Sequence, residues 1–171
     1  IYSGNAAVCL FLVFSGFVLC LGYFRERDKK KLTQGMRKRY FRLMPMILAV
    51  NLLIFFLMKL GLYQNAQTAV LTKSEAWFAG FNQFEPKLSG VLFESLFGCF
   101  AWGTNDYNGV LWTIPYLFWG ALLVYLTAYL IGEYKFRYVM YAVIILGTLK
   151  IDIYYAGAFL GFAASDFFCT Q

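Results

Sequence analysis

The sequence predicts an all-α fold: a polytopic transmembrane helical bundle with four or five membrane segments and one interfacial helix. Of its 171 residues, 61% are hydrophobic and only 14% are charged, whereas a soluble domain is roughly 45–50% apolar and about 25% charged. A chain of this size still exposes much of its surface, so one small globule cannot hide this many apolar side chains. We therefore expect an integral membrane protein that forms a single membrane domain over residues 1–171.

Five apolar runs are the predicted membrane segments, because about 20 residues cross the hydrocarbon core as a helix. They cover residues 6–24, 41–60, 111–132, 138–149 and 153–168. Pro45 and Pro115 each fall in the first turns of a run, where a missing backbone N–H does least harm. The last two runs are short, so we expect either a helical hairpin or two short spans in a locally thin bilayer.

Positive charge is concentrated in one segment, since nine of the 15 Lys and Arg residues lie between Arg25 and Arg42. We interpret residues 25–40 as a solvated basic loop and expect the whole segment 25–42 to be cytoplasmic, following the positive-inside rule. Residues 133–137, two crossings later, carry two more basic side chains and should face the same side. Because the basic cluster lies between membrane segments, the expected partners are membrane lipids, and a nucleic acid is not expected.

The segment 61–110 is then expected on the external or lumenal side. It is mostly loop-like, but apolar residues at 88, 91, 92, 96, 99 and 100 have helical spacing, with a polar face that carries Ser89 and Glu94. That stretch is too short to span comfortably, which favours an interfacial or re-entrant helix.

Two patterns predict contacts between helices. Asn51 lies at mid-span, where its amide must find a partner, most often on a neighbouring helix. Gly157, Gly161 and Ser165 recur every four residues and form a stripe that lets another helix approach closely. We favour packing inside the protein's own bundle over a dimer interface for this stripe.

The candidate binding residues cluster near the basic segment. Lys38, Arg39 and Arg42 share a helix face at the start of the second run, where they either set topology and bind lipid phosphate or hold a phosphate-rich cytoplasmic donor such as coenzyme A. Ser15 and Gly16 interrupt a bulky apolar helix. They form either a helix-packing notch or a close approach of the backbone to a ligand.

Other chemistry is limited by composition. The sequence contains no histidine, which removes a histidine-based zinc site and a histidine base from these residues, so no bound cofactor or metal is expected. The four cysteines form no CxxC pair, and three of them lie in apolar runs, so we interpret them as small buried hydrophobes. Residues 1–5 show no charged leader, and the chain opens almost directly into an apolar helix, which suggests a piece of a longer protein.

The ordered segments "GNAAVCLFLVFSGFVL", "KRYFRLMP" and "NGVLWTIPYLFWGALLVY" resemble the acyltransferase-3 family of integral membrane O-acyltransferases, and "YYAGAFLGFAASD" is similar to its small-residue segment. In the resemblance, Arg39, Arg42 and Pro45 match the family's "R-x-x-RL-x-P" motif. Asn108, Leu111, Trp112 and Thr113 match the start of its "LW-[ST]-L-x-x-E" helix.

The resemblance implies transfer of an acyl group, often acetyl, from acyl-CoA to a hydroxyl of a carbohydrate or lipid-like acceptor. Arg39, Arg42, Lys38, Ser15, Gly16 and Trp112 are the residues expected to bind substrate or acyl-CoA. The resemblance also implies about ten membrane helices, of which this chain would be roughly half, and an essential histidine on a helix preceding the "SGF" helix.

One departure from the family pattern weakens the prediction of an active enzyme. Where the family places a glutamate two residues after the position of Pro115, this chain has Leu117, and Trp119 also replaces a charged residue of one family variant. A carboxylate and a guanidinium lost together leave no orphan charge in the membrane. This departure leaves open a catalytically inactive member that acts as a membrane binding or structural protein. A transporter fragment is the other alternative, suggested by the helix count and by the broken helices near Pro115 and residues 150–152.

Overall fold

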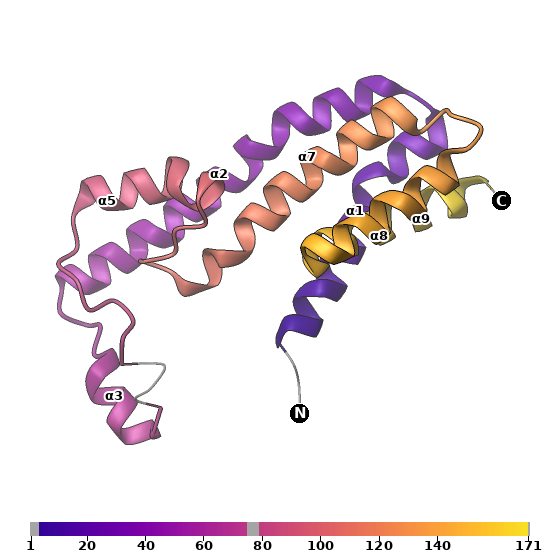
Figure 1. Cartoon of the computed structure of the whole chain (residues 1–171). Coiled ribbons are helices and arrows are strands. Elements are labelled where there is room, and N and C mark those ends of the chain that lie inside the picture. The colour runs from indigo at the N-terminus through magenta and orange to yellow at the C-terminus, as the bar shows by residue number, and fades with distance from the viewer. Residues whose placement is uncertain (1–3, 75–78, 171) are drawn as a thin grey trace. The chain divides into compact units, whose positions relative to one another are not determined.

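The computed structural model describes residues 4–74 and 79–170, which form helices and no strand (Figure 1). The long helices are α1 (Gly4–Glu26), α2 (Lys29–Lys59), α7 (Ile114–Ile131), α8 (Arg137–Ile151) and α9 (Ile153–Thr170). The short ones are α3 (Asn65–Thr72), α5 (Leu88–Phe93), the π-helical turn η1 (Glu94–Gly98), α6 (Cys99–Ala101) and the 3₁₀ turn η2 (Gly109–Thr113). The predicted all-α fold is confirmed.

The chain divides into two compact units. Unit 1 contains the described residues up to Tyr40 and those from Tyr116 onward, and unit 2 runs from Phe41 to Pro115. The division therefore falls inside α2 and inside α7. Each unit has its own buried core, with Phe162 in the first and Tyr107 in the second.

Three stretches are long and apolar enough to cross a membrane by length and composition: Gly4–Glu26, Lys29–Lys59 and Gly109–Ile131. These include the first three predicted segments, whereas α8 and α9 are shorter or less apolar, so their crossing stays a prediction. On α1, Leu10, Phe14 and Val18 form a stripe in which each side chain is 57–65% exposed. An apolar stripe of this kind suits a lipid environment, because water would penalise it.

The interpretation of residues 25–40 as a loop is wrong, because α2 begins at Lys29 and continues without interruption to Lys59. Only two residues separate α1 from α2. Arg27 adopts a left-handed φ of 55°, and the Asp28 carboxylate accepts a hydrogen bond from the backbone N–H of Lys30 at 2.9 Å. Lysine and arginine are good helix formers, so once Asp28 caps the start, the basic segment continues as helix.

In unit 1, α1 lies directly against α9, and glycines make the close approach possible. A Cβ added at Gly161 would fall 1.8 Å from the Val13 carbonyl oxygen, and one at Gly16 would fall 2.0 Å from the Ala158 carbonyl oxygen. A Cβ at Gly157 would meet the Cys9 carbonyl oxygen at 3.2 Å. The small-residue stripe therefore packs against a helix of the same chain, as predicted.

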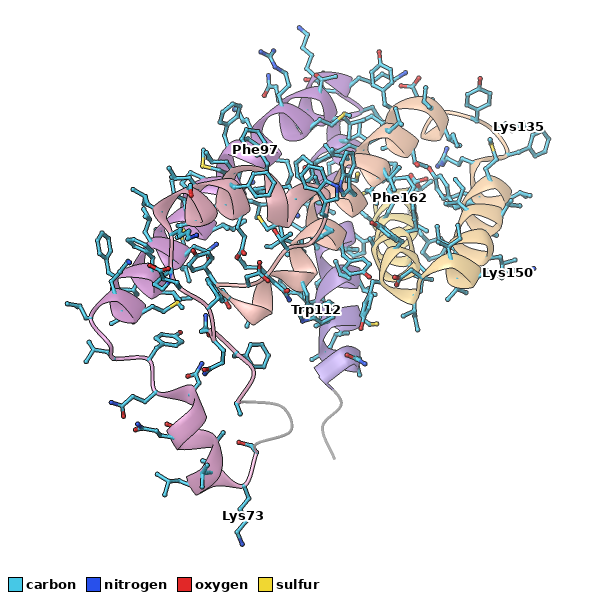
Figure 2. The ribbon with its side chains drawn as sticks, turned by 60° about the vertical axis from the view of Figure 1, so that its left-hand side comes forward. Lys73, Phe97, Trp112, Lys135, Lys150 and Phe162 are labelled. Carbon is cyan, nitrogen blue, oxygen red and sulfur yellow. The ribbon has the colours of Figure 1, made fainter. Side chains whose placement is uncertain are left out.

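Helices α8 and α9 form an antiparallel hairpin, which was one of the two arrangements expected for the last apolar runs (Figure 1). Only Asp152 separates them, and its carboxylate caps α9 by accepting a 2.9 Å hydrogen bond from the Tyr154 N–H. At the other end of the hairpin, the Tyr141 ring packs on Phe162 with 4.7 Å between centroids. Phe162, labelled in Figure 2, is fully buried.

The segment 61–110 is more helical than predicted, because α3 occupies part of the stretch interpreted as loop. The helical spacing from residue 88 onward is confirmed by α5, η1 and α6. Its middle is a π-helical turn, a feature that often marks functional sites. This turn carries Glu94 and Ser95, both of which are buried.

Candidate functional site

A cavity of about 560 Å³ lies within unit 2. Its described lining combines four asparagines, namely Asn65, Asn82, Asn105 and Asn108, with four aromatic residues, namely Tyr63, Phe81, Tyr107 and Trp112. None of the described lining residues carries a formal charge. Asparagine amides both donate and accept hydrogen bonds, and aromatic faces contribute apolar contact area. The cavity is thus suited to an uncharged molecule that carries hydroxyl groups.

Trp112 reaches this cavity because of how the chain enters α7. Asn108 is the N-cap of η2, and its side-chain oxygen accepts a 3.1 Å hydrogen bond from the Val110 N–H. The Thr113 hydroxyl donates to the Val110 carbonyl oxygen at 3.1 Å, within the same turn. The polar residues of the "NGVLWT" motif therefore build the turn itself, and they fix the direction in which Trp112, labelled in Figure 2, leaves the backbone.

Asn51, Glu94 and Ser95 form a buried polar cluster in unit 2. The Asn51 amide, fully buried on α2, donates to Glu94 Oε1 at 3.3 Å and to Ser95 Oγ at 3.1 Å. The expectation that Asn51 bonds to another helical segment is confirmed, because both partners belong to η1. Glu94 is 3% exposed, and no lysine or arginine in the described part of the chain forms an ion pair with it.

Glu94 lies outside the three stretches long enough to span a membrane. Burial raises the pKa of this carboxyl above its ordinary value, while hydrogen bonds from the backbone N–H groups of Asp106 and Tyr107 oppose the rise. Sequence reasoning placed Glu94 on a polar helix face but did not identify the groups that it contacts. Its distance in sequence from Asn51 gives no pattern that would have revealed the pair.

The basic residues of α2 have different environments. Lys38 and Arg42 are exposed, whereas Arg39 is partly buried. Arg39 Nη2 donates a 3.0 Å hydrogen bond to the backbone carbonyl oxygen of Leu117 on α7. Lys38, Arg39 and Arg42 all belong to α2, and within unit 1 Arg39 also ties α2 to α7.

Gly16 is engaged in the contact between α1 and α9, where a Cβ would collide with the Ala158 carbonyl. This geometry supports the helix-packing interpretation for Gly16. Ser15, the neighbouring residue, is only partly buried. A role for Ser15 and Gly16 in lining an acyl path stays a prediction.

A second charged cluster, unforeseen from the sequence, ties unit 1 together at the end of α1. Asp166 on α9 is fully buried and accepts hydrogen bonds from Arg27 Nη2 at 3.2 Å and Arg137 Nε at 2.5 Å. Arg27 Nη1 also donates to the Gly132 carbonyl oxygen at 3.2 Å. Both carboxylate oxygens are paired with guanidinium groups, so the cluster is a structural clamp that joins α9 to the segments following α1 and α7.

The exposed apolar stripe on α1 and the three stretches long and apolar enough to span a membrane indicate an integral membrane protein. A family model described as an acyltransferase domain, that of the acyltransferase-3 family, matches residues 1–168, nearly the whole chain. The protein therefore belongs to the acyltransferase-3 family and is, in general terms, a membrane acyltransferase. No curated protein and no solved structure matches the chain at a significant level.

Proposed function

We propose that this protein transfers an acyl group from acyl-CoA to a hydroxyl of a carbohydrate or lipid-like acceptor. The observation that carries the proposal is the family match over residues 1–168, which includes both the arginine motif and the "LWT" helix start. In the overall reaction, the acceptor oxygen bonds to the acyl carbonyl carbon and the thioester C–S bond breaks. A base takes the acceptor's proton, and a proton returned to the thiolate releases coenzyme A as the thiol. The family resemblance assigns that base to a histidine, and the 171 residues contain none, so it would be supplied from outside them.

The donor is assigned to the basic face of α2. Lys38 and Arg42 are exposed there, and guanidinium groups bind phosphate oxygens through two parallel hydrogen bonds. Segment 25–42 would face the cytoplasm, where acyl-CoA is present. Arg39 would contribute charge while its Nη2 stays on the Leu117 carbonyl.

The acceptor is assigned to the asparagine-lined cavity of unit 2. Most of its lining belongs to the segment 61–110, which is expected on the external or lumenal side, so the acyl group would cross the membrane between the donor and the acceptor. Its composition favours a carbohydrate over a lipid-like alcohol, because four amides offer hydrogen bonds that an alkyl chain cannot make. Trp112 and Tyr63 supply aromatic surface for the apolar face of a sugar ring.

A catalytically inactive, binding-only member is the second candidate, and Leu117 is the observation that favours it. Where the family carries a glutamate, this chain offers only the Leu117 backbone carbonyl to Arg39. The cavity and the basic face would then still bind their ligands, but no acyl group would move.

The experiment uses the full-length protein in nanodiscs, with radiolabelled acetyl-CoA as donor and methyl glycosides or dodecanol as acceptors. Arg42→Leu should weaken acetyl-CoA binding about 10- to 100-fold, the effect of losing a hydrogen bond to a charged group. Lys59→Leu removes an exposed cation at the other end of α2 and should leave binding unchanged. Equal binding by Arg42→Leu and the wild-type protein would refute the donor assignment, and ligand binding without transfer would establish the inactive candidate.

A further inference from the structure

The irregular segment between Gly103 and Asn108 forms one wall of the asparagine-lined cavity, through Asn105, Tyr107 and Asn108. It belongs to no helix, so its backbone N–H and C=O groups need partners from elsewhere in the protein. Two side chains supply those of Asp106 and Tyr107. Glu94 accepts from their N–H groups, and Asn82 donates to their carbonyl oxygens.

The contacts with Glu94 use both carboxylate oxygens. Oε2 accepts the Asp106 N–H at 2.9 Å, and Oε1 accepts the Tyr107 N–H at 3.3 Å. From the other direction, Asn82 Nδ2 donates to the carbonyl oxygens of Asp106 at 3.3 Å and Tyr107 at 3.0 Å. The same two residues are therefore held through their N–H groups and through their carbonyls.

The network extends beyond these contacts on both sides. Asn65 Nδ2 donates to Asn82 Oδ1 at 3.2 Å, and Asn82 itself holds a left-handed φ of 57° that asparagine tolerates better than most residues. On the far side, Asn51 anchors Glu94 to α2. Asn65 and Asn82 line the asparagine-lined cavity. Glu94 does not line it, and instead lines a separate, smaller cavity of about 280 Å³.

We propose that Glu94 is a positioning residue for acceptor binding, because it sets the wall that carries Asn105, Tyr107 and Asn108. This inference rests on the proposed function, since it takes the asparagine-lined cavity as the acceptor site. A carboxylate suits the role better than an amide does. A glutamine has only one acceptor oxygen, and its NH₂ group would face the N–H of either Asp106 or Tyr107, donor against donor.

The matched control is Ser95, the next residue on the same π-helical turn. It is fully buried and accepts a hydrogen bond from Asn51, as Glu94 does, but it has no hydrogen bond to the cavity wall. Ser95→Ala therefore removes a hydrogen bond to Asn51 but keeps the hydrogen bonds from Asp106 and Tyr107 to Glu94. A difference in acceptor KM between Glu94→Gln and Ser95→Ala therefore reports the loss of the hydrogen bonds to the irregular segment, and not the loss of a hydrogen bond to Asn51.

The test measures KM and kcat of the full-length protein in nanodiscs, with acetyl-CoA as donor and the best-transferred methyl glycoside as acceptor. Glu94→Gln should raise the acceptor KM about tenfold, with the acetyl-CoA KM and kcat within about twofold of the wild-type values. Glu94→Asp, which keeps two acceptor oxygens, should recover part of the loss. Ser95→Ala should keep the wild-type acceptor KM.

Hydrogen exchange supplies a second readout that needs no acceptor. The amide protons of Asp106 and Tyr107 should exchange about tenfold faster in Glu94→Gln than in Ser95→Ala. If the wild-type protein transfers acetyl and Glu94→Gln leaves the acceptor KM unchanged, or raises both KM values equally, the inference is overturned. If the wild-type protein transfers nothing, the proposed function fails. The exchange rates of Asp106 and Tyr107 then still decide whether Glu94 holds the segment between Gly103 and Asn108 in place.

Discussion

Replacing Gly161 with alanine is expected to force α1 and α9 apart. The new Cβ would lie 1.8 Å from the Val13 carbonyl oxygen and 2.8 Å from the Phe17 nitrogen. Both contacts are with backbone atoms, which cannot rotate away, so the helices would have to separate by more than about 1 Å. Overpacking of this kind costs about 1–3 kcal/mol. Alanine's helix propensity offsets somewhat less than about 1 kcal/mol of this cost, which leaves an expected net loss of up to about 2 kcal/mol.

Gly147 provides the matched control, because it also lies inside a helix and a Cβ there meets nothing within 4 Å. Gly147→Ala should stabilise the protein by up to about 1 kcal/mol through helix propensity alone. The assay is reversible unfolding of each variant in mixed micelles with increasing sodium dodecyl sulfate. The reasoning is refuted if Gly161→Ala is as stable as Gly147→Ala, because the close approach of the two helices would then not limit stability.

Two further predictions concern the buried polar clusters. Arg137→Gln should lower the free energy of unfolding by about 3–5 kcal/mol in the same assay, because it leaves buried Asp166 without its closest partner. Arg27→Gln should lower it by about 1 kcal/mol or less, because the Arg27 side chain is 38% exposed. Equal losses for the two variants would contradict this account of the clamp. Asn51→Leu should lose about 0.6–1.7 kcal/mol, the range measured for hydrogen bonds between membrane helices, and Ser95→Ala should lose less, because Glu94 remains bonded to Asn51. A neutral Asn51→Leu would show that this cluster adds no net stability.

Local patterns in the sequence were sufficient to predict most of the helices. Apolar runs, early prolines and the small-residue stripe each depend on residues within about one helix length, and the structure confirms the helices that they predict. The basic segment was misinterpreted because its charge was weighed above its helix propensity. Asp28, directly before the lysines, is the residue that could have indicated the helix start, since it caps the turn.

The clusters of the site were less predictable, because their members are far apart in the chain. Asp166 meets Arg27 across 139 residues of sequence, and no spacing rule connects them. Asn51 showed from its position alone that it needed a partner, but only the fold reveals that this partner is Glu94. The cavity wall is held by hydrogen bonds to main-chain atoms of Asp106 and Tyr107. Almost any residue type can make such bonds, so the sequence does not indicate them.

The departure at Leu117 has a local physical meaning in this structure. Arg39 lies near the start of an apolar stretch of α2, where an unpaired guanidinium would be costly. Its hydrogen bond to the Leu117 carbonyl shows that the main chain at this position satisfies part of the guanidinium. Arg39 therefore has a main-chain partner at the position where the family places a glutamate. The nanodisc assay measures directly whether acyl transfer proceeds without the family carboxylate at this position.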